Sequence, residues 1–216
     1  MLAAHYLLVR KRRRRVYTTQ SFHWLRKYPN CIKEIIPTKA NEIWVSDITY
    51  YRTKKGSVYI SFITDAYSKK IVGYHAADTL EAVHTLSALQ MAIKENGQSL
   101  TGLIHHSDRG AQYCSYDYVK LLQDNNIIIS MTENGDPLEN AIAERINGIM
   151  KQEYLEHHML NNKEEVMELL TASVNIYNKQ RPHMSCNLLT PEMVHQNNIA
   201  VQRNWKSYYK SKNVDP

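Results

Sequence analysis

Three short runs of β-branched and aromatic residues follow one another in the first third of this chain. They cover residues 42–51, 57–67 and 70–76, and turn-forming residues separate them at 54–56 and 68–70. Runs of this composition that are broken by turn residues are typical of strands joined by tight connections. They predict an antiparallel meander of three strands, which limits the folds that the rest of the chain can complete.

The hydrophobic period then changes from that of strands to that of helices. Residues 80–97 predict a helix, because apolar residues recur on one side and Gly97 stands where helices often end. That apolar side consists of Val83, Leu86, Leu89 and Ile93. The segments that follow alternate, with strands expected at 102–108 and 127–130 and helices at 116–126, 137–151 and 163–179. Strands that alternate with helices pair in parallel. The sequence therefore predicts an α/β fold, in which helices flank a mixed five-stranded sheet.

The positive charge of the chain is concentrated at its start. Residues 1–40 hold ten Lys and Arg against one acid, Glu34, although the net charge of all 216 residues is only +6. Such blocks form solvated arms that often lie on nucleic-acid phosphates, and a merely solvated tail is the alternative. The densest run contains the candidate DNA contacts Arg12, Arg13, Arg14 and Arg15.

The length of the chain suits one catalytic domain with appendages. We expect a basic arm or linker over 1–40, a catalytic core over 41–160, a helical extension over 161–195 and a polar tail over 196–216, with polar character beginning beyond Pro191. The three cysteines are far apart and odd in number, which predicts no disulfide framework and fits a reducing, cytoplasmic setting close to the nucleoid. The apolar start at 2–9 is too short to span a membrane.

Two acidic residues stand at unusual places in the predicted strands. Asp47 shares a strand face with Ile43, Val45 and Thr49, where aliphatic side chains are otherwise used. Asp108 ends the fourth strand, and the ligand sites of open α/β sheets lie at such carboxyl ends. Taken singly, each acid could serve only the structure, as the partner of a nearby cation or as the cap of a turn.

A third acid lies on the helix expected at 137–151. Asp136 as its N-cap and Pro137 as its first residue would fix where this helix begins. Its apolar stripe consists of Leu138, Ile142, Ile146 and Ile149, and the opposite arc consists of Asn140, Glu144, Asn147 and Lys151. An isolated polar arc would indicate only a solvated face. Glu144 gains significance because it completes a set of three acids and follows Asp108 after 35 intervening residues.

Three carboxylates suit a pair of Mg²⁺ ions, for which Mn²⁺ can substitute. Hard divalent cations take oxygen ligands from a few carboxylates and from substrate phosphates. Two such ions, roughly 3.5–4 Å apart, promote in-line phosphoryl displacement. Without the ions, neighbouring carboxylates raise one another's pKa. The set therefore predicts a metal-dependent site for phosphoryl transfer.

Five segments resemble the integrase core of bacterial insertion-sequence transposases, which are relatives of the retroviral integrases. The segments are 44-WVSDITY-50, 65-DAYSKKIVG-73, 104-IHHSDRGAQY-113, 139-ENAIAERINGIMKQE-153 and 177-YNKQRPHMS-185, with 190-TPE-192 after the last. The resemblance covers residues 41–195, and two Asp followed by a gap of 35 residues and a Glu are the signature of that superfamily. It implies an RNase H-like fold with strand order 3-2-1-4-5.

The resemblance also implies an activity and roles for particular residues. Asp47, Asp108 and Glu144 would be the catalytic residues and the Mg²⁺ ligands of a DDE transposase. The reaction would be DNA strand cleavage by water, followed by attack of the freed 3′-hydroxyl on another phosphodiester. The loop 131–137 would be a mobile segment before the catalytic helix. The implied DNA contacts are Asn140 and Lys151 on that helix, with Arg109, Gln112 and Tyr113 just past the second Asp.

The expected partners are the DNA of the transposon ends and of the target, and further copies of the chain. Members of this family usually carry helix-turn-helix segments ahead of the core, whereas about forty residues precede it here. A separately encoded helix-turn-helix protein is therefore an expected partner, and a truncated copy is the other interpretation. Two alternative functions remain: a nuclease that cuts without joining, and a non-catalytic remnant that only binds DNA. A tyrosine recombinase is disfavoured, because the His-x-x-Arg at 106–109 lies at a strand end rather than in a helical domain.

The two adjacent histidines in the fourth strand have a separate expectation. Neighbouring strand residues point to opposite faces, so one of His105 and His106 is expected to pack within the sheet and the other to turn toward the rim of the site. Metal ligation by either is disfavoured.

Overall fold

The computed structural model describes residues 23–33, 35–97, 99–133 and 140–201. Most strands and helices lie within two residues of the bounds that the sequence predicts. In chain order they are β1 (Ile43–Arg52), β2 (Ser57–Asp65), β3 (Ile71–Ala77), α1 (Ala82–Asn96), β4 (Ile104–Ser107), α2 (Tyr116–Asp124), β5 (Ile128–Met131), α3 (Ala141–Ile149), the π-helix η3 (Met150–Leu155), α4 (Lys163–Lys179), the short 3₁₀ turn η4 (Met184–Cys186) and α5 (Pro191–Asn197).

The five strands form one mixed sheet in the order β3-β2-β1-β4-β5. β1 pairs antiparallel with β2, and β2 pairs antiparallel with β3, so the predicted meander is confirmed. β4 lies parallel to β1 on one side and to β5 on the other. The strand order 3-2-1-4-5 and the RNase H-like arrangement are thus as expected, with β1 at the centre of the sheet.

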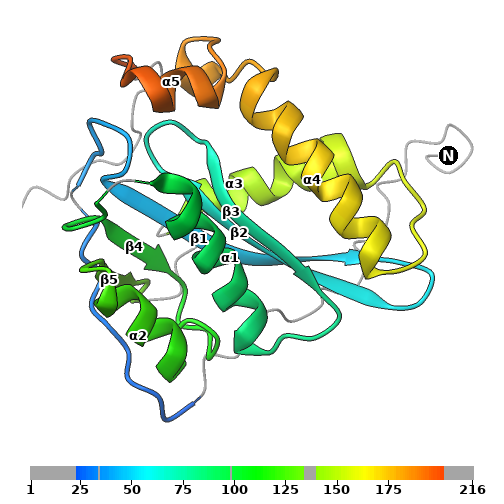
Figure 1. The fold of residues 1–216 in the computed structure, drawn as a ribbon, viewed down its shortest axis with the longest axis horizontal. Coiled ribbons are helices and arrows are strands. Elements are labelled where there is room, and N and C mark those ends of the chain that lie inside the picture. Colours follow the sequence, from blue (N-terminus) through cyan, green and yellow to red (C-terminus); the bar gives the residue numbers. More distant parts are fainter. Residues whose placement is uncertain (1–22, 34, 98, 134–139, 202–216) are drawn as a thin grey trace, which may run out of the picture.

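Helices cover both faces of the sheet (Figure 1). Residues from α1 and α2 pack on one face, where Trp44 and Ile48 of β1 belong to the largest buried cluster. Residues from α3, η3 and α4 pack on the other face, against β1, β2 and β3. The alternation of side chains along β1 therefore separates two cores. Asp47 lies on the side of the strand that faces α3.

α1 approaches β3 closely because β3 contains a glycine at the crossing. A Cβ placed on Gly73 would lie 2.3 Å from the main-chain oxygen of Ala88 and 2.9 Å from the Cβ of Ala92. The side of α1 that packs on the sheet accordingly carries small residues. Its buried residues are Thr85, Ala88, Leu89 and Ala92. Val83, predicted to lie on the packed side, is exposed, so that part of the sequence interpretation was wrong.

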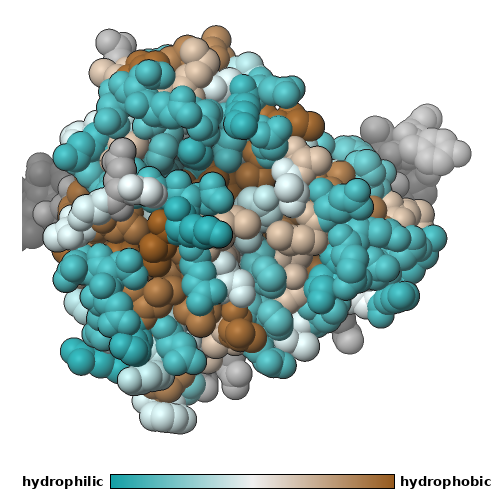
Figure 2. Space-filling view, viewed as in Figure 1, coloured by the Kyte–Doolittle hydropathy of each residue, from teal (hydrophilic) through white to brown (hydrophobic). Residues whose placement is uncertain are grey.

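Polar side chains cover much of the surface in the same view, and hydrophobic ones gather mainly over β4 and the neighbouring part of α1 (Figure 2). In the part of the chain that the structure describes, no helix is long and apolar enough to cross a membrane.

The helix that carries the third acid continues beyond its predicted end. α3 ends at Ile149 and passes directly into η3, which ends at Leu155. Ile146 and Ile149 are buried against the sheet, as the predicted stripe requires. The expected start at Asp136 and Pro137, and Leu138 of the stripe, lie outside the described residues.

Both edges of the sheet are bonded by other parts of the chain. At the β3 edge, the buried side chain of Asn178 in α4 accepts a hydrogen bond from the main-chain nitrogen of Ile71 and donates one to its oxygen, both over 2.9 Å. At the β5 edge, Met131 donates its main-chain N–H to Pro29 over 3.1 Å. Cys31 donates its N–H to Ser130 Oγ over 2.8 Å. The segment before β1 therefore runs along β5.

A short helix, α5, follows Thr190 in the region where the sequence interpretation placed polar character beyond Pro191. Thr190 caps α5 by accepting a hydrogen bond from Met193, and Pro191 occupies the first turn. Val194 is buried in a cluster with Tyr67 and Cys186. An N-cap threonine followed by proline is a helix start signal that favours α5 over a tail.

Candidate functional site

The first two acids of the predicted site project from neighbouring parallel strands. Val45 of β1 pairs with His106 of β4. The same register, continued by two residues, places Asp47 beside Asp108 at the carboxyl end of β4. The Gly110 N–H donates to Asp108 Oδ1 over 2.9 Å and so fixes the loop that follows β4. Both aspartates are partly exposed. Two residues 61 positions apart in the sequence are thus brought together by sheet topology.

The third acid comes from α3, whose polar arc faces β1. Asn140 Nδ2 donates to the main-chain oxygen of Ser46 over 3.0 Å. Asn147 Nδ2 donates to Asp47 Oδ2 over 2.8 Å. Glu144 lies between these two asparagines on the same arc and is exposed. The arc is therefore not simply solvated, because its two amides tie α3 to the strand that carries Asp47.

The charges of the other two acids act on Asp47. The pKa of Asp47 is raised from 3.8 to about 7, first because of burial and then because of the negative charge of Asp108. Glu144 raises it further, whereas hydrogen bonds from the Ile48 N–H and from Asn147 lower it. Like charges and low polarity disfavour a second carboxylate in this way. A nearby cation would therefore favour the charged form of Asp47.

The carboxylates of Asp47, Asp108 and Glu144 do not form a ready metal-binding cluster in this structure. Within residues 23–33, 35–97, 99–133 and 140–201, no three His, Cys, Asp or Glu side chains are grouped closely enough to hold a metal ion as they stand. Asp47 Oδ1 accepts the N–H of Ile48, and its Oδ2 accepts the amide of Asn147. The amide oxygen of Asn147 is buried and has no hydrogen-bond partner among the described residues.

Three of the expected DNA contacts are buried. Tyr113 is only 1% exposed, and its hydroxyl lies 3.1 Å from Ser46 Oγ. Gln112 is 6% exposed and donates its amide to the main-chain oxygen of Leu80 over 3.0 Å. Asn140 is 7% exposed and holds β1, as described above. Such side chains do not present themselves to DNA, because their polar groups already bind the protein interior. The structure therefore gives them packing and anchoring roles in place of the expected contacts.

The two remaining contacts in the described core are accessible. Arg109 is partly exposed and follows Asp108 directly; its Nε is covered by the protein and has no hydrogen-bond partner among the described atoms. Lys151 in η3 places its Nζ 4.0 Å from the centre of the Tyr50 ring, in a cation–π contact. Both cations are near the acids in the sequence. Arg12 to Arg15, and residues 134–137 of the expected mobile loop, lie outside the described residues.

Both histidines of β4 are buried, so the prediction that one turns toward the rim was wrong. His105 Nε2 is 2.9 Å from Tyr118 OH, and His106 Nδ1 is 2.9 Å from Ser130 Oγ. Burial and, after it, the charge of the neighbouring His106 lower the pKa of His105 to about 3, so His105 is neutral. β4 is covered on both faces, which is usual for a strand between parallel neighbours.

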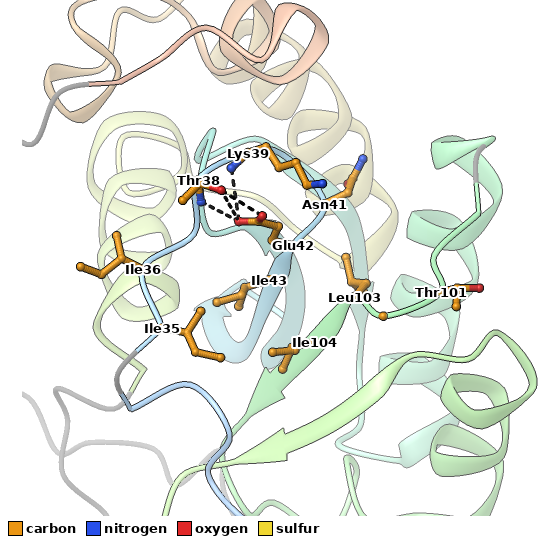
Figure 3. A pocket seen from close by; sticks show the side chains of 11 residues that line it. Ile35, Ile36, Thr38, Lys39, Asn41, Glu42, Ile43, Thr101, Leu103 and Ile104 are labelled. Atoms are coloured by element: carbon orange, nitrogen blue, oxygen red, sulfur yellow. Dashed lines mark hydrogen bonds between the residues drawn. The ribbon is translucent and has the colours of Figure 1, made fainter.

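The hollow of about 390 Å³ in Figure 3 lies away from the acids. It is lined by Ile43 at the start of β1 and Ile104 at the start of β4, with Ile35 and Ile36 from the segment before β1 (Figure 3). Asp47 is four positions after Ile43, which corresponds to about 13 Å along a strand. The hollow is therefore at the start of β1 and β4, whereas the candidate site is at the middle of β1 and the end of β4.

Comparison with protein families and with curated proteins gives a consistent result. Two family models described as integrase core domain match the chain, one over residues 37–137 and the other over 125–191. An uncharacterized 31 kDa protein of insertion element IS600 from Shigella sonnei is 37% identical over 176 residues, which are 81% of this chain and 64% of that protein. The transposase of IS629 from Shigella sonnei is 35% identical, over 69% of this chain and 50% of its own length.

A putative transposase of IS986/IS6110 from Mycobacterium tuberculosis is 36% identical, over 72% of this chain and 58% of its own length. The chain thus spans about half to two thirds of the length of these curated relatives.

Solved structures share the fold. The catalytic core domain of HTLV-2 integrase, determined in complex with magnesium, superposes with a TM-score of 0.57 at 21% identity, covering 73% of this chain and 97% of that one. A chain of the simian T-cell lymphotropic virus intasome superposes with a TM-score of 0.64 at 17% identity, covering 92% of this chain and 66% of that one.

Proposed function

Because this chain belongs to the integrase core family of insertion-sequence transposases, we propose that it cleaves DNA strands and transfers their 3′-hydroxyl ends to new phosphodiesters, with Mg²⁺ as its cofactor. The observation that carries the proposal is geometric: the β1–β4 register sets Asp47 beside Asp108, and Asn147 joins Asp47 to α3, the helix that carries Glu144. The pKa of Asp47 is raised in keeping with this, first by burial and then by the charges of Asp108 and Glu144. The proposal assigns to these three acids, which are distant in the sequence, the role of promoting phosphoryl transfer together.

The side chains present fit a divalent metal. Carboxylate oxygens are the ligands that Mg²⁺ prefers, and a cation would reverse the charge repulsion that now disfavours ionised Asp47. The buried amide oxygen of Asn147, which lacks a partner, adds an unsatisfied acceptor beside Asp47. Asp47, Asp108 and Glu144 would hold two Mg²⁺ ions, and Mn²⁺ would substitute. When bound, the ions activate the attacking oxygen and stabilise the leaving oxygen of an in-line displacement.

The chain's own residues orient these ligands. Asn147 holds one oxygen of Asp47, and Asn140 fastens the start of α3 to β1. Glu144 is exposed on the same helix, between these two asparagines. Lys151 on Tyr50 and the partly exposed Arg109 are cations that can meet DNA phosphates.

The proposed reaction forms no bond between protein and DNA. In the first step, a water oxygen bonds to phosphorus and the 3′ oxygen leaves with a proton. In the second step, that 3′-hydroxyl attacks a phosphodiester of the target and displaces the target's own 3′ oxygen, so the number of phosphodiester bonds is conserved. Both steps are displacements at phosphorus, which one metal-binding site can promote in turn.

The expected partners remain proposals. We propose that the chain acts on transposon ends and on target DNA, that copies of it associate there, and that a separately encoded helix-turn-helix protein contributes to end recognition. Trimeric and dimeric forms are named for the HTLV-2 integrase core, which has the same fold. Size-exclusion chromatography with light scattering, with and without DNA, tests the association.

The test of the function is the variant Glu144→Gln in an assay with labelled DNA ends. Cleavage and joining should fall below detection while DNA binding persists, because the amide loses a charged metal ligand without disturbing the buried side of α3. Glu168→Gln makes the same chemical change at an exposed position of α4 and should retain activity. If Glu144→Gln joins ends at the normal rate, the assigned role is wrong.

Supplying ends with a preformed 3′-hydroxyl separates strand transfer from cleavage. Cleavage without joining would indicate a nuclease of this fold, and DNA binding without either step would indicate a non-catalytic remnant.

A further inference from the structure

Residues 23–28 are anchored beside the second acid and precede the residues that the integrase core models match. His23 Nε2 is 2.9 Å from the main-chain oxygen of Arg109, the residue that follows Asp108. Leu25 and Tyr28 pack against the core on the side of α1 and α2. The segment is therefore held at three points along its length, next to the loop that follows β4.

Trp24 projects from this anchored segment into solvent. It is 93% exposed, more than any other large hydrophobic residue in the described ranges. Trp44, in contrast, is completely buried. A scattered exposed hydrophobic residue needs no explanation. Trp24 differs because His23 and Leu25 on either side are both tied to the protein, so the indole is presented outward from a fixed main chain.

The surroundings of Trp24 are positively charged. Arg26 and Lys27 are exposed. The Arg26 guanidinium lies 5.1 Å from the centre of the Tyr28 ring, which fixes its position relative to the anchored part of the segment. The pKa of the buried Cys114 thiol is raised by burial and by Asp108. Lys27 and Arg109 both lower it. Lys27, Arg109 and Asp108 are thus all within electrostatic range of one side chain.

An exposed indole followed by exposed cations suits single-strand DNA recognition. Every nucleobase offers an aromatic face on which tryptophan can stack, and cations neutralise the phosphates that flank it. The partly exposed Arg109, with its unpartnered Nε, follows Asp108 directly, and its main-chain oxygen contacts His23, the residue before Trp24. A strand that brings a phosphate to Asp108 would therefore pass Arg109 first and residues 23–28 next.

We propose that residues 23–28 form a rim of the DNA site, on which an unpaired nucleobase stacks against Trp24 while Arg26 and Lys27 bind phosphates of the same strand. The inference rests on the proposed function, since it requires a DNA strand at the acids. It adds a base-stacking residue that lies outside the matched integrase core.

The test is a double-mutant cycle between the protein and the DNA. Binding is measured without divalent metal by fluorescence anisotropy, using a labelled duplex with a nick and a short single-stranded flap, and a series in which one nucleotide at a time is abasic. Trp24→Ala should weaken binding roughly 5- to 150-fold, the range for one stacked base. An abasic unit at the stacking position should weaken binding by the wild-type protein to a similar extent, and should not weaken Trp24→Ala further.

Two variants control the cycle. Trp24→Phe should keep most of the affinity and the abasic profile, because a phenyl ring still stacks. Met159→Ala removes another highly exposed side chain and should show the wild-type abasic profile. Melting temperatures of all variants should match the wild type, because neither side chain is buried.

The proposal is overturned if Trp24→Ala has the affinity and the abasic profile of the wild type. It is also overturned if Trp24→Ala binds DNA normally but loses self-association, since the rim would then be a contact between copies. The proposed function can fail on its own. If Trp24 is coupled to one base but the protein never cuts DNA, the stacking proposal stands and the proposed catalytic function is wrong. If the protein cuts and joins DNA but Trp24 shows no coupling to any base, only the stacking proposal is wrong.

Discussion

Asn147 Nδ2 donates a hydrogen bond to Asp47 Oδ2 over 2.8 Å, across 100 residues of sequence. This bond joins the last turn of α3 to the middle of β1 and leaves Asp47 in one orientation. It also lowers the pKa of Asp47, against the larger effects of burial and of Asp108. Asn147 is therefore a positioning residue that acts through a proposed metal ligand.

We predict that Asn147→Ala slows strand transfer about 10- to 100-fold, the usual effect of removing a residue that orients a metal ligand. Because the lost hydrogen bond favoured the charged form of Asp47, the activity should also require a higher pH or more Mg²⁺. The pH profile and the Mg²⁺ dependence of joining measure both effects. Asn175→Ala, at an exposed position of α4, is the matched control. Unchanged profiles for Asn147→Ala would leave the bond a purely structural role.

Asp47→Asn should stabilise the protein in the absence of metal while removing its activity. The folded pKa of about 7 lies above the unfolded value of 3.8, so the folded state binds more protons between these pH values. Wild-type stability should therefore fall as pH rises from about 4 to 7 and stay reduced above 7. Asp47→Asn cannot ionise, so it avoids this loss of stability and should raise the free energy of unfolding at pH 8 by about 1–3 kcal/mol.

Urea unfolding with a metal chelator at pH 8 and at pH 4 measures this difference, which should vanish at the lower pH. Asp78→Asn, at an exposed acid after β3, should show no such pH dependence. A destabilised Asp47→Asn at pH 8 would mean that the acid repulsion is not the dominant effect at this site.

The elements of the fold were predictable because each has a local signal. Alternation gave the strands, and Gly97, with a φ of 62°, ends α1 where a left-handed cap was expected. The packed side of α1 was not predictable, because it depends on the missing side chain of Gly73 on another strand. Residue types alone indicated an acid on β1, but not which partner would orient it.

At the candidate site, too, local patterns were predictable and contacts between distant segments were not. Spacing and resemblance predicted three acids, and the raised pKa of Asp47 supports their proximity. Tyr113 and Gln112 lie just past Asp108 in sequence, yet both turn inward, because the loop after β4 must also cover the core beneath α1. Hydrogen bonds between distant segments, such as that of His23 with Arg109, leave no periodic pattern in the sequence and were missed.

The basic arm, whose arginines lie outside the described residues, is predicted to bind DNA through phosphates alone. Replacing Arg12 to Arg15 by Gln should weaken binding to all sequences alike. The slope of log affinity against log salt concentration should become shallower by about 0.9 for each lost phosphate contact. Anisotropy titrations over a series of salt concentrations measure the slope. An unchanged slope would contradict phosphate binding by the arm, and a sequence-dependent loss would indicate base contacts instead.

Asp65 is a fourth acid near the end of a strand, and its bonds assign it to the structure rather than to the chemistry. It is fully buried and accepts hydrogen bonds from the main-chain N–H groups of Asn41 and Ser68, each over 2.7 Å. Burial alone would raise its pKa, but His195 and Ser68 hold it below the usual value. Its stabilising effect is therefore present above about pH 4 and is lost as pH falls through the lowered folded pKa.

Asp65→Asn should lower the free energy of unfolding at pH 7 by about 2–4 kcal/mol, because an amide places N–H groups against N–H donors in a buried site. The loss should shrink in acid, where the wild-type carboxyl is also neutral. The folded fraction of this variant should still join DNA ends, since Asp65 holds the turn after β2 and not the substrate. Urea unfolding, and joining measured per folded molecule below the melting temperature, test the two statements. Normal stability with abolished joining would instead place Asp65 among the catalytic acids.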